Sequence, residues 1–134
     1  MTKVLTVGVF DLLHLGHVLL FKRARELGDF LIVAAQRDEF ITKFKPNAKV
    51  VYDINERLFM INSIKYVDKS VAYTDISKLM YEVDFDIWAK GPDQNNFACQ
   101  AFEQWCIKNG KTIIVLPRTE GVSSSSLREY LKDK

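Results

Sequence analysis

The sequence predicts a single α/β domain spanning residues 1–134, with helices covering both faces of a five-stranded parallel sheet. Short β-branched runs alternate with segments of helical spacing along the chain, which is the order of βαβ units. The chain is 48% hydrophobic, which is enough to build one core. Because neither a repeat nor a linker divides the chain, one domain accounts for its whole length.

The N-terminal half is predicted to contain two strands and two helices. Residues 3–9 are β-branched and lead into a glycine turn, so they form a buried first strand. Apolar residues recur at helical spacing over 15–27, and this helix ends near Gly28. The order continues with a buried strand at 30–35, an irregular basic loop over 36–54 and a helix at 55–64. A loop of that length in a small domain is usually functional.

The C-terminal half repeats the alternation. We expect a strand at 67–73, a helix at 75–83, a strand at 86–90, a helix at 96–108, a strand at 112–116 and a last helix. Asp75 stands near the start of the first of these helices, and Asn109-Gly110 provides a stop signal for the second. The last helix is expected to begin in the serine run at 123–126 and to continue to Lys132.

Charge and composition exclude several classes of protein. A net charge of +2 is too small to indicate nucleic-acid binding by electrostatics alone. No stretch resembles a signal peptide, and no apolar run approaches the ~20 residues that cross a bilayer. Cys99 and Cys106 lie seven residues apart with helical spacing, so we expect two buried thiols rather than a disulfide or a zinc site. We therefore expect a cytoplasmic protein that neither binds nucleic acid nor inserts into a membrane.

Three polar loops follow predicted strands. They are residues 8–17, residues 91–94 and residues 118–124. In a parallel sheet ligands bind beyond the carboxyl ends of the strands, so these loops are expected to converge on one edge. The central prediction is that residues 8–17 and residues 118–124 bind a single triphosphate from opposite sides.

The first loop, G-V-F-D-L-L-H-L-G-H, carries the two histidines of the chain, His14 and His17. Gly8 and Gly16 allow a ligand to approach the backbone closely. Imidazoles at the start of a helix can bind phosphate oxygens together with backbone N–H groups and the helix dipole. The alternative is that the histidines only pack and cap the helix. Their pairing around a glycine directly after a strand favours phosphate binding.

Two basic groups have weaker signals. Lys43 and Lys45 stand in the long loop, where either would neutralise a phosphate if the loop covers the ligand; a solvated loop is the alternative. Lys45 is the preferred candidate. Arg57 opens a helix and would bind phosphate bidentately, but a surface salt bridge with Asp53 or Glu56 explains it equally well.

The remaining loops combine turn formers with phosphate-binding groups. Asp93, in G-P-D-Q, would hold Mg²⁺ through water or accept from a substrate hydroxyl, although a plain turn accounts for this stretch. Residues 118–126 read R-T-E-G-V-S-S-S-S. One serine is enough to cap a helix, and four after Arg118 are more than a cap needs. A run of hydroxyl and N–H groups at a helix start is a phosphate cradle.

These stretches resemble the cytidylyltransferases of the HxGH nucleotidyltransferase superfamily, above all the small bacterial glycerol-3-phosphate cytidylyltransferases. The matching stretches are G-V-F-D-L-L-H-L-G-H (8–17), F-K (44–45), N-E-R (55–57), Y-V-D (66–68) and R-T-E-G-V-S-S-S (118–125). They occur in the same order and at similar spacing over nearly the whole chain. The resemblance implies a Rossmann-like fold, Mg²⁺ as cofactor, a homodimer, and transfer of CMP from CTP to a small phosphate monoester.

The resemblance also implies roles for individual residues. His14 and His17 would stabilise the pentacoordinate α-phosphate, and Lys45 would bind the α-phosphate or the acceptor. Arg118 and Ser123 would hold the β- and γ-phosphates, and Asp11 would orient the first loop or help to bind the metal. The expected nucleotide-binding residues are Gly8, Val9, Phe10, Asp11, Gly16, Asp93, Arg118, Thr119, Glu120, Gly121, Ser123 and Ser124. The expected acceptor-binding residues are Lys45, Arg57 and Asp93.

Two departures keep the substrate open. Val9 stands where the glycerol-phosphate enzymes usually have threonine, and G-P-D-Q stands where they have Gly-Asp-Asp-Trp. The latter is more similar to archaeal FMN adenylyltransferases. We therefore weigh three functions: a cytidylyltransferase acting on glycerol 3-phosphate, an adenylyltransferase acting on FMN or a sugar phosphate, and an inactive nucleotide-binding regulator.

Overall fold

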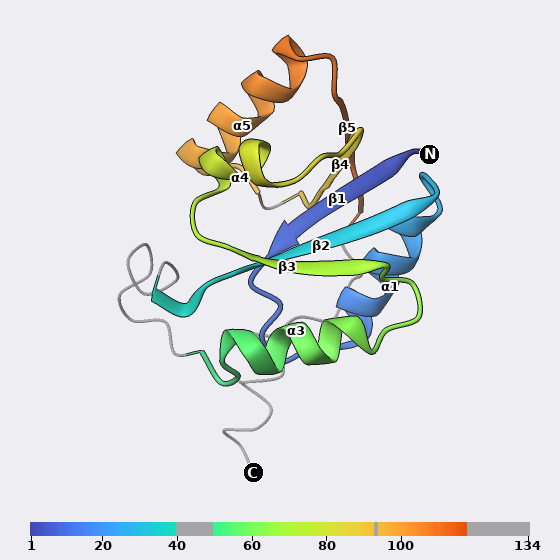
Figure 1. Ribbon diagram of the computed structural model, residues 1–134, viewed down its shortest axis with the longest axis vertical. Helices are drawn as coiled ribbons and strands as arrows, with labels where there is room; N and C mark the ends of the chain where they lie inside the picture. The colour runs from blue at the N-terminus through green and yellow to red at the C-terminus, as the bar shows by residue number, and fades with distance from the viewer. Residues whose placement is uncertain (40–49, 93, 118–134) are drawn as a thin grey trace.

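The computed structural model describes residues 1–39, 50–92 and 94–117 (Figure 1). Within these residues the chain forms a five-stranded sheet with the order β3-β2-β1-β4-β5, in which every neighbouring pair is parallel. The strands are β1 (Lys3–Gly8), β2 (Phe30–Gln36), β3 (Lys69–Tyr73), β4 (Ile87–Lys90) and β5 (Thr112–Val115). The predicted fold class is confirmed, with each strand end within two residues of its expected position.

Helices connect the strands as the sequence predicts. They are α1 (Leu15–Arg25), α3 (Ile54–Asn62), α4 (Ile76–Glu82) and α5 (Phe97–Lys108). Asp53, Asp75 and Asn96 cap the last three of these, each through a side-chain oxygen that accepts a backbone N–H of the first turn. The predicted helix at 123–132 lies outside the described residues.

Gly28 serves a different purpose from the one expected. α1 ends at Arg25, and Glu26 caps it in a right-handed conformation, so the helix does not end through a left-handed glycine. Instead, a Cβ at Gly28 would lie 2.7 Å from the carbonyl oxygen of Thr2. Asp29 N and Phe30 N both donate to this same carbonyl. The glycine is therefore needed because the chain passes close to the start of β1.

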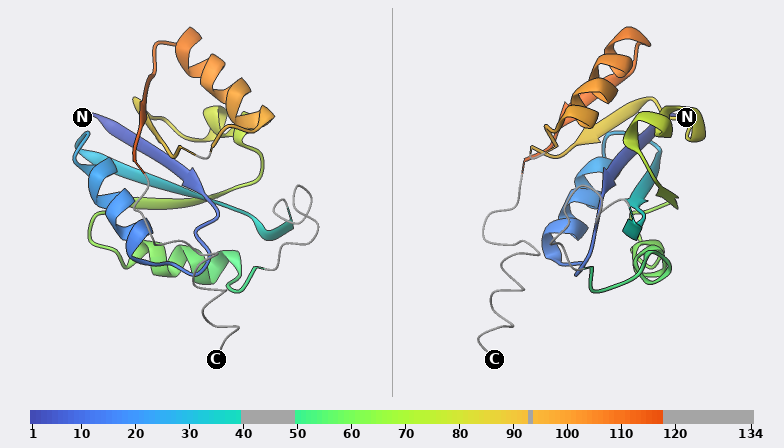
Figure 2. Two further views of the ribbon diagram at one scale, coloured as in Figure 1. Left: turned by 180° about the vertical axis from the view of Figure 1, so that it is seen from behind. Right: turned by 90° about the vertical axis from the view of Figure 1, so that its left-hand side faces the viewer.

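The helices form one layer on each face of the sheet (Figures 1 and 2). Successive residues of β1 point to opposite faces: Leu5 packs with Trp88 and Phe102 beneath α4 and α5, and Val4 packs with Phe21 beneath α1 and α3. This explains why the strands are apolar in continuous runs. Cys99 and Cys106 are free thiols of α5 in the first of these cores, as predicted.

β1 is the strand at which the direction of winding reverses, because β2 lies on one side of it and β4 on the other. Two polar loops follow the carboxyl ends of this central pair: residues 9–14 after β1, and the turn that begins at Gly91 after β4. Such a point is where open α/β sheets bind ligands. None of the helices among the described residues has the length and hydropathy that a bilayer crossing requires.

Candidate functional site

The two histidines lie against one another at the start of α1. Their rings are stacked, with centroids 3.9 Å apart. His14 Nδ1 accepts from the backbone N–H of Gly16 at 3.0 Å, and His17 Nδ1 accepts from the backbone N–H of His14 at 3.3 Å. Because Nδ1 is the acceptor in both rings, Nε2 carries the proton of each neutral imidazole. Capping and ligand binding are therefore compatible: one nitrogen of each ring caps the helix and the other is a donor.

The surroundings of His17 keep its imidazole neutral. Burial, followed by the proximity of His14, lowers the pKa of His17 from 6.5 to about 4. The Phe10 ring packs edge-on against His17, with centroids 5.4 Å apart, and against Phe21. At neutral pH His17 therefore offers an N–H donor to a phosphate rather than a positive charge.

The loop between β1 and α1 adopts an unusual backbone conformation. Phe10 and Leu12 have φ values of 56° and 50°, a region that costs energy for residues with side chains. This conformation places the Phe10 ring over Gly8, where a Cβ would lie 2.8 Å from Phe10 Cζ. Gly8 is thus required for close packing of the loop that presents the histidines.

Asp11 orders this loop against the residues that precede α3. Its carboxylate is buried and accepts from the backbone N–H groups of Val51, at 2.7 Å, and Tyr52, at 2.9 Å. Of the two roles predicted for Asp11, the geometry supports the ordering role. The described residues contain no group of three or more His, Cys, Asp or Glu side chains able to hold a metal ion. Both oxygens of Asp11 bind backbone N–H groups, which fixes the carboxylate within the loop. Its role towards Mg²⁺ stays a prediction.

Arg57 is placed differently from both expectations. Its side chain is completely buried. Nη1 donates to the carbonyl oxygens of Val9, at 2.7 Å, and Gln36, at 2.8 Å, while Nε donates to that of Tyr52 at 3.0 Å. Nη2 forms an ion pair with Asp38. The guanidinium therefore joins the ends of β1 and β2 to the start of α3 and does not present itself to an acceptor phosphate.

The alternative of a surface salt bridge for Arg57 is also wrong. Asp53 and Glu56 instead cap α3 reciprocally, each accepting the backbone N–H of the other. The sequence nevertheless contains a pattern that predicts burial of Arg57. Arg57 falls at helical spacing from Ile54 and Ile61, so it lies on the apolar face of α3.

Gln94 and Asn95 are functional candidates that the sequence analysis missed. The Gln94 side chain donates to the Val7 carbonyl oxygen at 2.6 Å and accepts from the Gly91 N–H at 3.0 Å. Asn95 donates to the Pro92 carbonyl oxygen at 2.7 Å. Two side chains thus fix the turn after β4. The stretch G-P-D-Q predicts a turn with one functional carboxylate, and no local sequence pattern indicates the side-chain contacts of Gln94 and Asn95.

Most of the remaining predicted residues lie outside the described part of the chain. They are Lys43, Lys45, Asp93, Arg118, Thr119, Glu120, Gly121, Ser123 and Ser124. Their roles, and the expected meeting of the serine run with the histidines, stay predictions. The described residues bring together Gly8 to His17 and the turn after β4, which Gln94 joins to β1.

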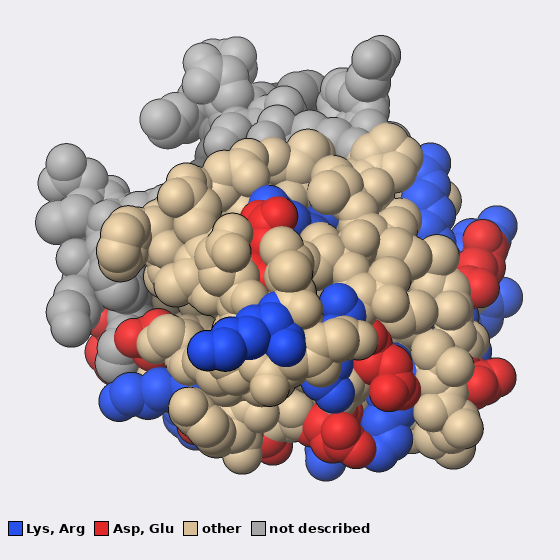
Figure 3. All heavy atoms as spheres, turned by 90° about the horizontal axis from the view of Figure 1, so that it is seen from above, with Lys and Arg blue, Asp and Glu red and all other residues tan. Residues whose placement is uncertain are grey.

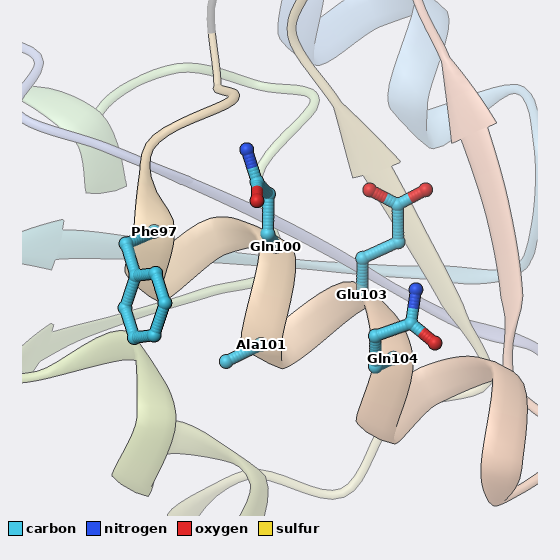
Figure 4. A pocket seen from close by; sticks show the side chains of 5 residues that line it. All are labelled: Phe97, Gln100, Ala101, Glu103 and Gln104. Atoms are coloured by element: carbon cyan, nitrogen blue, oxygen red, sulfur yellow. The ribbon is translucent and has the colours of Figure 1, made fainter.

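The remaining surface has other features. α5 bears a hollow lined by Phe97, Gln100, Ala101, Glu103 and Gln104 (Figure 4), and none of these residues belongs to the polar loops. On the face seen in Figure 3, Lys and Arg side chains lie among Asp and Glu rather than forming a patch of one sign. A mixed surface of this kind gives no electrostatic footprint for nucleic acid on that face.

A doubly wound parallel sheet, with stacked imidazoles and a helix start beside its switch point, defines a Rossmann-like protein that binds phosphate groups. A sequence profile described as cytidylyltransferase-like matches residues 5–130. The chain belongs to the cytidylyltransferase-like family, as the sequence resemblance predicted, and its relatives are nucleotidyltransferase enzymes.

Relatives with two different names have similar identity to this chain. Glycerol-3-phosphate cytidylyltransferase of Staphylococcus aureus is 37% identical, with 100% of this chain and 98% of the relative covered. FAD synthase of Thermoplasma volcanium is 39% identical over 99% of this chain and 96% of the relative. A crystal structure titled as a lipopolysaccharide core biosynthesis protein of the same archaeon superposes with a TM-score of 0.72 at 33% identity, covering 89% of this chain and 97% of that one. The family is therefore established, and the substrates are not.

Proposed function

We propose that this protein transfers CMP from CTP to glycerol 3-phosphate, yielding CDP-glycerol and pyrophosphate. The observation that carries the proposal is the stacked pair of His14 and His17, whose Nδ1 atoms are used within the loop so that Nε2 is the donor. The choice of substrates is supported by full-length similarity to enzymes named for them.

The reaction joins two phosphates. An oxygen of the acceptor phosphate attacks the α-phosphorus of CTP, the bond to the β-phosphate breaks, and pyrophosphate leaves. Charge accumulates on the non-bridging oxygens of the α-phosphate, where N–H donors fixed in advance are most effective. His14 and His17 supply such donors. Lys45 would add a positive charge at the α-phosphate or acceptor, Arg118 and Ser123 would hold the β- and γ-phosphates, and the backbone of residues 118–121 would help to read cytosine.

Mg²⁺ is proposed as the cofactor, bound mainly by the phosphates of the nucleotide. Magnesium commonly keeps several waters and takes few protein ligands when it binds a nucleotide. Asp11 would order the loop beside the metal or help to bind it, and its carboxylate also holds Val51 and Tyr52. EDTA should abolish turnover, and added Mg²⁺ should restore it.

A second function is favoured by two observations. FAD synthases match this chain at 39% identity, and the turn after β4 reads G-P-D-Q. The corresponding reaction would transfer AMP from ATP to FMN. It differs in base and acceptor but uses the same attack on an α-phosphate, so the histidine pair serves both.

One experiment separates these functions. Pyrophosphate release is measured with CTP and ATP, each combined with glycerol 3-phosphate, FMN and a sugar phosphate, and products are identified by mass. Release with CTP and glycerol 3-phosphate supports the proposal, whereas release with ATP and FMN replaces it. Absence of turnover combined with thermal stabilisation by CTP would indicate a regulator instead.

The lysine and the assembly are tested in the same preparation. Lys45→Ala should lower kcat strongly and Lys43→Ala should not; the reverse result would assign the role to Lys43. A homodimer is expected, and light scattering of the full chain measures its mass.

A further inference from the structure

The ladder between the two central strands stops short of the edge that carries the polar loops. β1 pairs with β2 over its whole length, from Lys3↔Phe30 to Gly8↔Ala35. Its pairing with β4 comprises Val4↔Ile87 and Leu5↔Trp88. Beyond Leu5 the backbone of β1 therefore has no ladder partner in β4, although β1 continues to Gly8 and β4 to Lys90.

The carboxamide of Gln94 bridges the two chain segments beyond the last pair of this ladder. Nε2 donates to the Val7 carbonyl oxygen at 2.6 Å, and Oε1 accepts from the Gly91 N–H at 3.0 Å. One carbonyl and one N–H are the groups that a peptide unit of a neighbouring strand would bind. The Gln94 side chain thus replaces the missing rung of the ladder between β1 and the chain after β4.

The same turn is held from its other side by Lys90. Its ammonium is buried and donates to Asn95 Oδ1 at 3.0 Å and to Glu103 of α5 at 3.1 Å. Asn95 in turn donates to the Pro92 carbonyl oxygen. α5 and its partners thus hold one side of the turn. On the other side, Gln94 links the turn to the end of β1, from which the loop that carries His14 and His17 (the histidine loop, residues 9–17) continues.

We infer that Gln94 is a positioning residue that sets how the turn after β4 faces the end of β1, and thereby determines which acceptor the enzyme uses. This inference rests on the proposed function. Transfer to glycerol 3-phosphate and transfer to FMN share the attack on an α-phosphate, so the histidine loop cannot distinguish them. The base is expected to be read by residues 118–121. The turn after β4 lies at the switch point of the sheet, where such folds bind ligands, and its Asp93 is expected to contact the acceptor as well as the nucleotide.

The variants Gln94→Ala and Gln94→Glu separate the two contacts. Alanine removes both, while an ionised glutamate still accepts from Gly91 N–H but cannot donate to the Val7 carbonyl. Gln104→Ala is the matched control, since Gln104 is an exposed glutamine of α5 (Figure 4). Amide hydrogen exchange at Gly91 should accelerate in Gln94→Ala and stay near the wild-type rate in Gln94→Glu.

Kinetics use whichever acceptor of the panel supports wild-type turnover. Both Gln94 variants should raise the KM for that acceptor about tenfold, the size expected for a lost buried hydrogen bond. The KM for the nucleotide should change less than the KM for the acceptor, and the control should match the wild type. The ratio of kcat/KM for glycerol 3-phosphate to that for FMN should change in both variants.

Several results would overturn the inference. An unchanged KM for the acceptor in both variants would contradict it. Equal increases in the KM for nucleotide and for acceptor, together with a lower melting temperature, would also contradict it, because that pattern is typical of a purely structural residue. If the wild-type protein releases no pyrophosphate with any pair, the proposed function fails and the acceptor role fails with it. If the wild-type protein is active and both variants behave like it, the inference about Gln94 is wrong while the proposed function stands.

Discussion

Asp11 and Arg57 hold the same residue, Tyr52, by its two backbone groups. The carboxylate of Asp11 accepts the Tyr52 N–H, and the guanidinium of Arg57 donates to the Tyr52 carbonyl oxygen. Arg57 also binds the carbonyl oxygen of Val9, which lies in the same loop as Asp11. The histidine loop and the approach to α3 are therefore fastened together by two buried charged side chains of opposite sign.

Replacing Arg57 by alanine should destabilise the whole fold. Three carbonyl oxygens would lose their donor, and Asp38 would lose its partner. Leaving a buried acceptor without its donor costs about 1–3 kcal/mol, so three lost hydrogen bonds should together cost about 3 kcal/mol or more. Urea unfolding followed by circular dichroism measures this loss. Arg57→Lys should recover only part of it, because one ammonium cannot reach all four groups.

Arg37→Ala is the control for this variant, since Arg37 is exposed. Its free energy of unfolding should stay within about 0.5 kcal/mol of the wild type. If Arg57→Ala unfolds at the wild-type urea concentration but raises the KM for the acceptor, the guanidinium binds substrate and the structural account is wrong.

Gly8→Ala should damage the histidine loop through the Phe10 ring. The added Cβ would lie 2.8 Å from Phe10 Cζ, so the ring has to move, and with it the edge that packs on His17. Crowding of this kind typically costs about 1–3 kcal/mol. Gly91→Ala provides the comparison, because a Cβ there has its nearest contact at 3.8 Å. Equal stabilities of the two variants would contradict the proposed crowding.

The fold was predictable because the signals for it are local. Continuous apolar runs mark buried parallel strands, and Asp75 and Asn109-Gly110 mark helix ends where the structure has them. Gly28 shows the limit of such signals. A glycine after a helix predicts a left-handed stop, but the glycine is required by contact with Thr2, which is distant in sequence.

The site was only partly predictable, for a related reason. The pairing of His14 and His17 around Gly16 is a local pattern, and the structure stacks the two rings. The contact from Gln94 to Val7 depends on where the ladder between β1 and β4 ends, which no local pattern encodes. A charged residue at the start of a helix predicts a surface role, but Arg57 lies on the apolar face of α3 and is buried.

Two replacements of His17 distinguish its two nitrogens. Asparagine places an acceptor near the position of Nδ1, which binds the His14 N–H, whereas glutamine places a donor near the position of Nε2. If Nε2 stabilises the transition state, His17→Asn should lower kcat about 100-fold or more while folding normally. His17→Gln should retain more activity. Equal activity of both variants and the wild type would exclude a catalytic role for His17.

His17 also predicts how stability depends on pH. Its pKa is lowered to about 4 in the folded protein, chiefly by burial, whereas an unfolded histidine titrates near 6.5. The unfolded chain therefore binds the proton more tightly, so the free energy of unfolding decreases as the pH falls from 6.5 towards 4. The contribution is complete above pH 6.5, and up to about 3 kcal/mol of it disappears by pH 4.

The measurement for this prediction is the free energy of unfolding in urea at a series of pH values between 7 and 4. Carboxylates titrate in the same range, so the informative quantity is the difference between the wild type and His17→Asn, which keeps the cap on His14 but cannot bind a proton. That difference should shift in favour of the variant as the pH falls. Parallel curves would mean that His17 has an ordinary pKa, and the neutral donor assigned to it near pH 6 would then be a charged imidazolium.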